Sequence, residues 1–235
     1  MSIGAAPPLL GLSIPLYDEA EGVAAVVSDV VAALESERIQ FVLALVDNGS
    51  RDGTRAQVEA LAQDRRITGV YLDENAGYGG GIWAGIEALR AGADPEILGW
   101  IWGDGQVDPA CLGPLYRACL GGAPMAKAVR TVREDGPLRA IQGQAFAWIL
   151  SQMGQSASDP HGCPKLFQRD TLRALNLQHR DWFLDAEAML GAADLGLEIA
   201  ETPVTMQARS TGSSKIRPST TWEFCVNLWE KKRRR

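Results

Sequence analysis

The stretch FVLALVDNGSRDGT, residues 41–54, decides the fold, because six consecutive apolar residues are followed at once by polar and turn-forming ones. Such a run indicates a strand that is buried on both faces and ends in a loop. Its repetition along the chain, with helical patterns in between, predicts an α/β fold: one Rossmann-like domain with a mostly parallel central sheet flanked by helices. The other apolar runs lie at 9–14, 67–72 and 97–102, and the helical patterns at 18–37, 54–64 and 78–90.

The second half of the chain is less regular. We expect strands at 125–132 and 197–204 and helices at 138–153, 185–195 and 220–229. No linker separates two domains, so we expect one domain over residues 1–216. The remainder, 217–235, is predicted to be an amphipathic helix and a basic tail, because aromatic residues there precede KKRRR.

Charge and composition exclude several classes of protein. The net charge is −6, and five of the 23 basic residues are the last five, so the body is strongly acidic and we expect no nucleic-acid partner. The four cysteines form no CxxC pair and only two histidines exist, which argues against a zinc site. Without an apolar run of membrane-spanning length or a secretory leader, we expect a cytoplasmic protein. The basic tail is either solvated or contacts the inner face of the membrane.

The predicted strands are followed directly by residues that can bind a ligand. Carboxylates in PLYDE (15–19) and DNGSRDGT (47–54) can accept hydrogen bonds from a base or a ribose, although turn and cap chemistry explains them too. Glycines in ENAGYGGGIWAG (74–85) follow the third strand rather than the first, so we reject a dinucleotide fingerprint and expect close helix packing beside a phosphate-bearing ligand. Asp104 and Gln106 share a face and suit a divalent cation, or form a polar turn.

Six motifs in this order resemble the family 2 glycosyltransferases with the GT-A fold, most of all the dolichol-phosphate mannose synthase-like, polyprenyl-phosphate branch. The resemblance runs over residues 9–215, nearly the whole chain. The motifs are PLYDE, VDNGSRDGT, NAGYGGG, GDGQVDP, DPHGCPKLFQRD and RSTGSSK.

The resemblance implies an inverting transfer of a sugar from a nucleotide-diphosphate sugar to an acceptor, with polyprenyl phosphate favoured. The residues that it places at the donor are Pro15, Tyr17, Glu19, Asp47, Asn48, Gly77, Gly79, Asp104, Arg209 and Lys215. Those that it places at the reaction are Arg130, Asp159, Asp185 and Glu187. It places Asp104 and Gln106 at a divalent cation, Mg²⁺ or Mn²⁺.

Each of these roles has a plainer alternative. Arg130 can form a surface salt bridge, and Asp159 can belong to a turn before Pro160. Asp185 and Glu187 suit any helix N-terminus, whose dipole favours negative charge. Arg209 and Lys215 can belong to a solvated basic loop.

One departure from the family pattern concerns the cation. Trp102 stands where the D-x-D motif has its first aspartate, so we expect the cation requirement to be weakened or lost. The indole either stacks on a ligand or closes a buried strand. Asn48 also stands where the family often has a second aspartate, but it keeps the hydrogen-bonding shape.

The acceptor decides which chemistry is needed. A polyprenyl phosphate is already ionised, so positioning and charge neutralisation suffice. A hydroxyl of a soluble saccharide or metabolite needs a general base, for which Asp159, Asp185 and Glu187 are candidates. A third possibility, suggested by Trp102, is a non-catalytic protein that binds nucleotide sugars.

Overall fold

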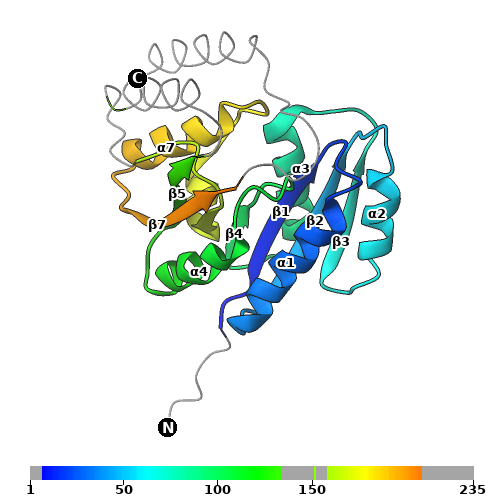
Figure 1. Ribbon diagram of the computed structural model, residues 1–235. Coiled ribbons are helices and arrows are strands. Elements are labelled where there is room, and N and C mark those ends of the chain that lie inside the picture. Colours follow the sequence, from blue (N-terminus) through cyan, green and yellow to red (C-terminus); the bar gives the residue numbers. More distant parts are fainter. Residues whose placement is uncertain (1–6, 134–150, 152–157, 208–235) are drawn as a thin grey trace.

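A computed structural model describes residues 7–133, 151 and 158–207 of the chain (Figure 1). The strands in these residues form one seven-stranded sheet in the order β3-β2-β1-β4-β6-β5-β7. Strand β6 is antiparallel to its neighbours β4 and β5, and the other neighbouring pairs are parallel, which confirms the predicted mostly parallel sheet. The strands are β1 (Leu10–Leu16), β2 (Phe41–Asn48), β3 (Ile67–Leu72), β4 (Ile97–Trp100), β5 (Met125–Arg133), β6 (Lys165–Gln168) and β7 (Ile199–Met206).

The helices cover both faces of the sheet, each face with its own apolar core. Helices α1, α2 and α4 share one core, to which Val27, Val58 and Leu115 belong. Helices α3, α6 and α7 share the other core, and α3 lies behind the sheet in the view of Figure 1. The helices are α1 (Val23–Ser36), α2 (Thr54–Leu61), α3 (Gly77–Ala91), α4 (Leu112–Leu120), α6 (Arg169–Leu175) and α7 (Leu184–Asp194), and the 3-10 helix η1 (Pro109–Cys111) precedes α4.

Helix α1 begins at Val23, five residues later than the apolar pattern predicts. The preceding N–H groups are used elsewhere: Glu19 donates to Thr54 Oγ1 at 2.9 Å, and Ala20 donates to Asp52 Oδ2 at 3.1 Å. Asp18 also has a positive φ of 51°, which a helix does not allow. Hydrogen bonds to the loop after β2 therefore move the start of α1 to a later residue. Strand β3 has its predicted bounds, and α3 is longer than predicted by one residue at each end.

Four elements were not predicted: η1, α4, β6 and α6. Strand β6 has only four residues, KLFQ, and begins with the fully buried Lys165, so it carries no apolar run. The strand predicted at 197–204 is observed two residues later as β7. Its Pro203 is compatible with pairing because β7 lies at an edge of the sheet, beside β5.

The helix predicted at 138–153 lies outside the described residues, apart from residue 151. The predicted C-terminal segment 217–235, with its helix at 220–229, also lies outside them. In the part of the chain that the structure describes, no helix is long and apolar enough to cross a membrane.

Candidate active site

The loops that follow β1 and β2 are fastened to each other by hydrogen bonds between main chain and side chain. The N–H of Asp18 donates to Ser50 Oγ at 3.1 Å, and the N–H of Arg51 donates to Asp18 Oδ1 at 2.8 Å. The bonds that delay α1 join the same two loops. Turn chemistry, the plainer interpretation, therefore explains Asp18, Ser50 and Asp52. It does not explain the residues at the strand ends themselves.

Asp47 and Asn48, at the end of β2, are both buried and both hold loops in place. The Asp47 carboxylate accepts the N–H of Ser50 at 3.0 Å and lies 3.0 Å from Nε of Arg55. Asn48 accepts the N–H of Ala76 and donates to the carbonyl of Gly77, both at 2.9 Å. An amide makes both bonds at once, which explains why asparagine suits this position better than a carboxylate.

The three candidates from β1 lie beside this strand end. Leu16 pairs with Asp47 in the parallel register, so Pro15, Tyr17 and Glu19 are at the carboxyl edge of the sheet. Glu19 is buried and Tyr17 is half-buried. Ligands of open α/β sheets bind at this edge. The structure thus brings the five candidates of β1 and β2 to one place.

The glycines of α3 permit a close approach of the loop that precedes α7. A Cβ on Gly79 would lie 2.7 Å from the carbonyl carbon of Arg180, and Gly77 has a φ of +81°. The N–H of Gly80 donates to the carbonyl of Arg180 at 2.7 Å. Close packing therefore accounts for these glycines. They pack against the loop that contains Arg180 as well as against the sheet.

A continuous chain of polar contacts crosses the site from β4 to β6. Trp102 Nε1 donates to Tyr78 Oη at 2.9 Å, and Tyr78 donates to Asp185 Oδ2 at 3.1 Å. Asp185 Oδ1 is 2.6 Å from Lys165 Nζ, and both side chains are buried. Burial and the charge of Asp185 hold the pKa of Tyr78 well above its usual value, so the phenol stays protonated. Trp182 stacks on the Tyr78 ring at 4.4 Å.

Arg130 and Asp159 form a second ion pair on the neighbouring strand β5. Two guanidinium nitrogens of Arg130, Nε and Nη2, lie 2.7 and 2.5 Å from the carboxylate oxygens, and the main-chain N–H of Arg130 donates to Oδ2 at 3.0 Å. The Arg130 side chain is only 7% exposed, so the pair is not the surface salt bridge of the alternative interpretation. Burial raises the pKa of Asp159, but the Arg130 bonds outweigh it and hold that pKa well below its usual value.

A buried lysine supports the loop that carries Asp159. Lys127 Nζ donates to the carbonyls of Ser158 and Asp159 and lies 3.1 Å from a carboxylate oxygen of Glu201. Burial, followed by the charge of Lys165, lowers the pKa of Lys127 to about 8. Burial likewise lowers the pKa of the nearby His161 to about 4, so its ring is neutral at neutral pH.

Glu187 lies two residues after Asp185 in α7 and faces the loop that precedes this helix. Its Oε2 accepts the N–H groups of Gln178 and His179, both at 2.9 Å, and its Oε1 is 3.1 Å from His179 Nδ1. Burial raises the pKa of Glu187, but the hydrogen bonds from His179 and Gln178 outweigh this and lower it. Glu187 thus anchors the loop before α7, the same loop that packs on Gly79.

Asp104 and Gln106 follow β4 and form a tight polar turn. Asp104 Oδ1 accepts the N–H of Gln106 at 3.1 Å. The amide nitrogen of Gln106 donates to the carbonyl of Gln207 at 3.1 Å, and the Gln207 N–H donates back to the carbonyl of Gln106 at 2.8 Å. Among the described residues no three His, Cys, Asp or Glu side chains gather as metal ligands. These residues alone therefore do not fit a cation held by the protein.

Arg209 and Lys215 lie outside the described residues, and the roles assigned from the resemblance remain predictions. What the structure adds is three positions that the sequence reasoning did not select: Tyr78, Lys127 and Lys165. A signal for the lysines was present, because each has mostly apolar neighbours on both sides, in MAKAV and in CPKLF. Lysine is almost never fully buried without a partner.

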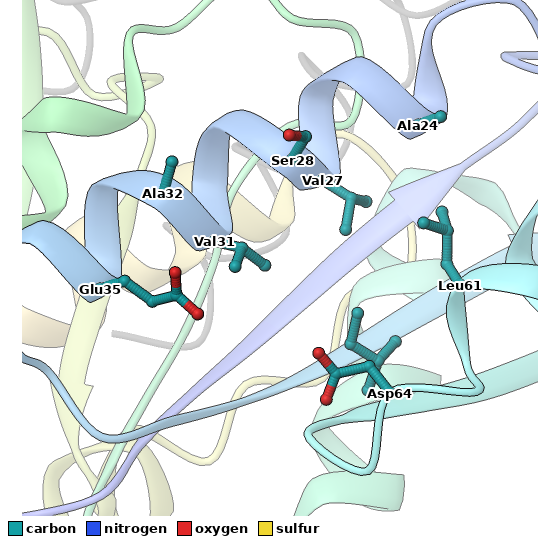
Figure 2. Close-up of a pocket in the computed structure, with 9 residues that line it drawn as sticks. Ala24, Val27, Ser28, Val31, Ala32, Glu35, Leu61 and Asp64 are labelled. Atoms are coloured by element: carbon teal, nitrogen blue, oxygen red, sulfur yellow. The ribbon is translucent and has the colours of Figure 1, made fainter.

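One surface hollow lies apart from these residues. Figure 2 shows it between α1 and the end of α2, where Val27 and Val31 face Leu61. It encloses about 290 Å³ and contains no residue of the candidate site.

Solved structures with a similar arrangement are GT-A glycosyltransferases. Mannosyl-3-phosphoglycerate synthase from Rubrobacter xylanophilus matches 97% of this chain and 74% of its own, with a TM-score of 0.72 and 16% identity. Glucosyl-3-phosphoglycerate synthase from Mycobacterium tuberculosis, solved with Mn²⁺, uridine diphosphate and glucosyl-3-phosphoglycerate, matches 95% and 79%, with a TM-score of 0.71 and 16% identity. These likenesses confirm the predicted GT-A fold.

Residues 12–175 match the family described as glycosyl transferase family 2, and the chain belongs to that family. A particular relative is the undecaprenyl-phosphate 4-deoxy-4-formamido-L-arabinose transferase of Shewanella sediminis, 26% identical over 88% of this chain and 61% of the relative. Another is the dodecaprenyl-phosphate galacturonate synthase of Rhizobium johnstonii, 27% identical over 93% of this chain and 65% of the relative. The chain thus spans less than two thirds of the length of either relative.

Proposed function

We propose that the chain transfers a sugar, with inversion, from a nucleotide-diphosphate sugar to a phosphate oxygen of a polyprenyl phosphate. Membership of glycosyl transferase family 2 supports the transfer. The names of the two relatives, one an undecaprenyl-phosphate and one a dodecaprenyl-phosphate enzyme, support the class of acceptor.

The observation that carries the choice of acceptor is the state of three carboxylates. Asp159 is bound by the guanidinium of Arg130, and Asp185 by Lys165 and Tyr78. Glu187 accepts two main-chain N–H groups. Such partners favour the ionised form of Asp159 and Glu187, which makes these two poor bases, and both oxygens of Asp185 already have partners. A phosphate acceptor needs no base, whereas a sugar or metabolite hydroxyl does.

In the proposed reaction an ionised phosphate oxygen of the acceptor attacks the anomeric carbon from the face opposite the diphosphate. The new carbon–oxygen bond forms as the bond to the donor diphosphate breaks, and the nucleoside diphosphate leaves with the electron pair. No proton has to move. Developing negative charge on the leaving group is what fixed positive charges stabilise, and Arg130 is proposed to contribute such a charge.

The donor is proposed to lie along the carboxyl edge of the sheet. The residues proposed to frame the nucleoside are Pro15, Tyr17, Glu19, Asp47 and Asn48, with Gly77 and Gly79 beside the diphosphate. Asp104 is proposed to face the diphosphate. Gln106, two residues after Asp104, donates to the carbonyl of Gln207, the last described residue before Arg209 and Lys215. Those two cations are proposed to bind the same diphosphate.

A divalent cation, Mg²⁺ or Mn²⁺, would supply charge neutralisation at the diphosphate. The described residues offer it one carboxylate, Asp104, because Trp102 stands at the other position of the motif. We therefore propose a requirement for the cation that is weakened, with the donor diphosphate providing most of its ligands.

The C-terminal residues 217–235 are proposed to form an amphipathic, basic end at the inner, cytoplasmic face of the membrane. Its five terminal basic residues suit an anionic surface, at about 1 kcal/mol each. Flotation with vesicles containing phosphatidylserine tests this. A chain that ends at residue 230 should float less than the full chain, and equal flotation would contradict the proposal.

The first experiment is a thermal-stability panel of UDP-, GDP-, CMP- and dTDP-sugars, with and without Mg²⁺ or Mn²⁺. A ligand at 100 times its Kd stabilises by about 2.7 kcal/mol, which raises Tm by roughly 5–10 °C in a domain of this size. A shift with one base identifies the donor class. No shift with any of them would contradict donor binding.

Transfer of labelled sugar to undecaprenyl phosphate then tests the reaction. Asp104→Asn should lower transfer by at least about 100-fold if Asp104 acts at the developing charge. Asp108→Asn is the matched control, because Asp104 and Asp108 each accept the N–H two residues ahead, at 3.1 and 2.9 Å. Transfer to a soluble saccharide but not to the lipid would overturn the proposed acceptor.

A further inference from the structure

The Trp102 indole has one side-chain partner at its N–H group and another over its ring. Its N–H donates to Tyr78 Oη at 2.9 Å. The Arg130 guanidinium carbon lies 5.6 Å from the centre of its ring, within cation–π range. The side chain is partly buried and packs against both apolar cores of the domain. Packing against both cores is what the strand-closing interpretation predicts.

The direction of the hydrogen bonds requires a donor at position 102. Tyr78 has one proton and gives it to Asp185 Oδ2, 3.1 Å away, so its oxygen is left as an acceptor. The indole N–H supplies that acceptor with a proton. An ionised carboxylate at position 102 has none to give, and it would compete with Asp185 for the one proton of Tyr78. It would also add a negative charge beside a buried one.

Trp102 therefore contacts one member of the Arg130–Asp159 pair and is linked to the Lys165–Asp185 pair through Tyr78. Through Tyr78 it supports Asp185 and Lys165, and through its ring it supports Arg130, which Asp159 fixes by two side-chain contacts. The pairs come from different parts of the fold: one from β6 and α7, the other from β5 and the loop before β6.

Trp102 also offers no oxygen ligand to a metal ion at this position of the D-x-D motif. In the described residues no cluster of three His, Cys, Asp or Glu side chains is formed, and the Gln106 amide nitrogen is directed at the Gln207 carbonyl. Affinity for Mg²⁺ and Mn²⁺ depends on the number of charged oxygen ligands. One carboxylate, Asp104, gives little affinity by itself.

We propose that Trp102 is a positioning residue that braces Tyr78 and Arg130 where the family motif has a metal-ligating carboxylate, so that the free protein holds no divalent cation. A cation then enters only as a complex with the donor diphosphate. The entry of the cation with the donor rests on the proposed function. The contacts of Trp102 and the absence of a bound cation in the free protein do not.

The first test is a titration of the full chain with Mn²⁺ alone, in which the electron paramagnetic resonance signal of the unbound ion is measured. We expect no site with a Kd below about 1 mM, and in Trp102→Asp an affinity higher by about tenfold or more. A wild-type site that is about tenfold tighter than this limit and disappears in Asp104→Asn would overturn the proposal. Should Trp102→Asp fail to fold, the wild-type titration decides by itself.

The second test reads the brace directly, in the indole ¹H–¹⁵N resonances. Trp102→Phe assigns the Trp102 signal, and Tyr78→Phe should shift it, because the hydrogen-bond acceptor of the indole is removed. Trp83 provides the matched control: the Arg180 guanidinium lies 4.9 Å from the centre of its ring, but its buried Nε1 has no hydrogen-bond partner among the described residues. Its resonance should stay in place in Tyr78→Phe. An unmoved Trp102 signal would overturn the brace.

Kinetics separate positioning from simple stability. Once the donor is known, Trp102→Phe should lower kcat by about fivefold to tenfold, the worth of one hydrogen bond, with KM for the donor unchanged within about twofold. Trp83→Phe should change neither. Equal values of kcat for Trp102→Phe and wild type would contradict a positioning role. If no nucleotide sugar binds at all, the proposed function fails, and the Mn²⁺ and resonance experiments still judge the brace.

Discussion

At the β1 and β2 end of the site, four main-chain N–H groups are bound by side-chain oxygens of the neighbouring loop. At the β5, β6 and α7 end, carboxylates are bound by buried cations instead, in the pairs Lys165–Asp185 and Arg130–Asp159. The first arrangement is a sum of bonds worth about 1 kcal/mol each. The second is a set of charges that are tolerated only together, because each would be costly alone.

This difference predicts how each end responds to substitution. The loops of β1 and β2 should lose stability in small, independent steps. The ion-paired end should lose it in one large step when either partner is removed. The four predictions that follow are ordered by the size of the expected effect.

The largest effect is expected from Lys165→Met. It leaves Asp185 buried without its cation, and such a change costs about 3–5 kcal/mol of unfolding free energy. Urea unfolding followed by circular dichroism measures it. Arg66→Met is the control, since Arg66 pairs with Asp64 and Glu35 at a position that is 41% exposed and should cost less than about 1 kcal/mol. Equal costs for the two variants would remove the contrast between the ends.

Gly79→Ala should come second, at about 1–3 kcal/mol, because the new Cβ would meet the main chain of Arg180 at 2.7 Å. The clash would separate α3 from the loop that Glu187 holds. Gly53→Ala is its counterpart at the other end, where the nearest atom is the Ala20 Cβ at 3.5 Å, and it should change stability by less than about 0.5 kcal/mol. Thermal unfolding of both variants decides. A harmless Gly79→Ala would show that this contact is not tight.

Thr54→Val should cost about 1 kcal/mol, because it removes the acceptor of the Glu19 N–H and the donor to Asp52. The same measurement on Thr68→Val, at an exposed position of β3, gives the baseline. The loss should also add to that of Ser50→Ala in the double variant, as independent bonds do. A loss as large as that of Lys165→Met would show that the two ends are built alike.

The smallest effect is a dependence on pH. The pKa of Glu187 is lowered in the folded state, from an ordinary value of 4.5, so its contribution to stability is complete above pH 4.5 and is lost as the pH falls below it. Glu187→Gln should therefore flatten the fall of the unfolding free energy between about pH 4.5 and 3. Glu21→Gln, at an exposed position, should leave the slope unchanged. An unaltered slope in Glu187→Gln would contradict the shift.

The two ends also differ in how far the sequence predicts them. Around β1, β2 and β3, apolar runs and local turn signals are close together in the chain, and both the strands and the residues that follow them were predicted. The start of α1 was missed because its N–H groups bond to a loop 35 residues away. At the other end the deciding contacts are longer still: Tyr78 reaches Asp185, 107 residues further on.

Buried lysines are the second reason for the difference. A pattern of apolar residues treats Lys165 as the end of a run, so the four-residue β6 was not predicted, although its motif was recognised. The candidate list likewise held Asp185 and Asp159 but not the lysines that stabilise them, Lys165 directly and Lys127 through the loop. Charge compensation between distant segments leaves no periodic trace in one sequence.

The antiparallel strand β6 has a consequence for synthesis on the ribosome. Strand β4 ends at Trp100, whereas its neighbour in the sheet begins at Lys165. During translation the first four strands can therefore pair while one edge of β4, with the sequence ILGW, still has no neighbour. An uncovered apolar edge invites pairing with another chain. The nascent protein is accordingly most prone to self-association in the interval before β6 emerges.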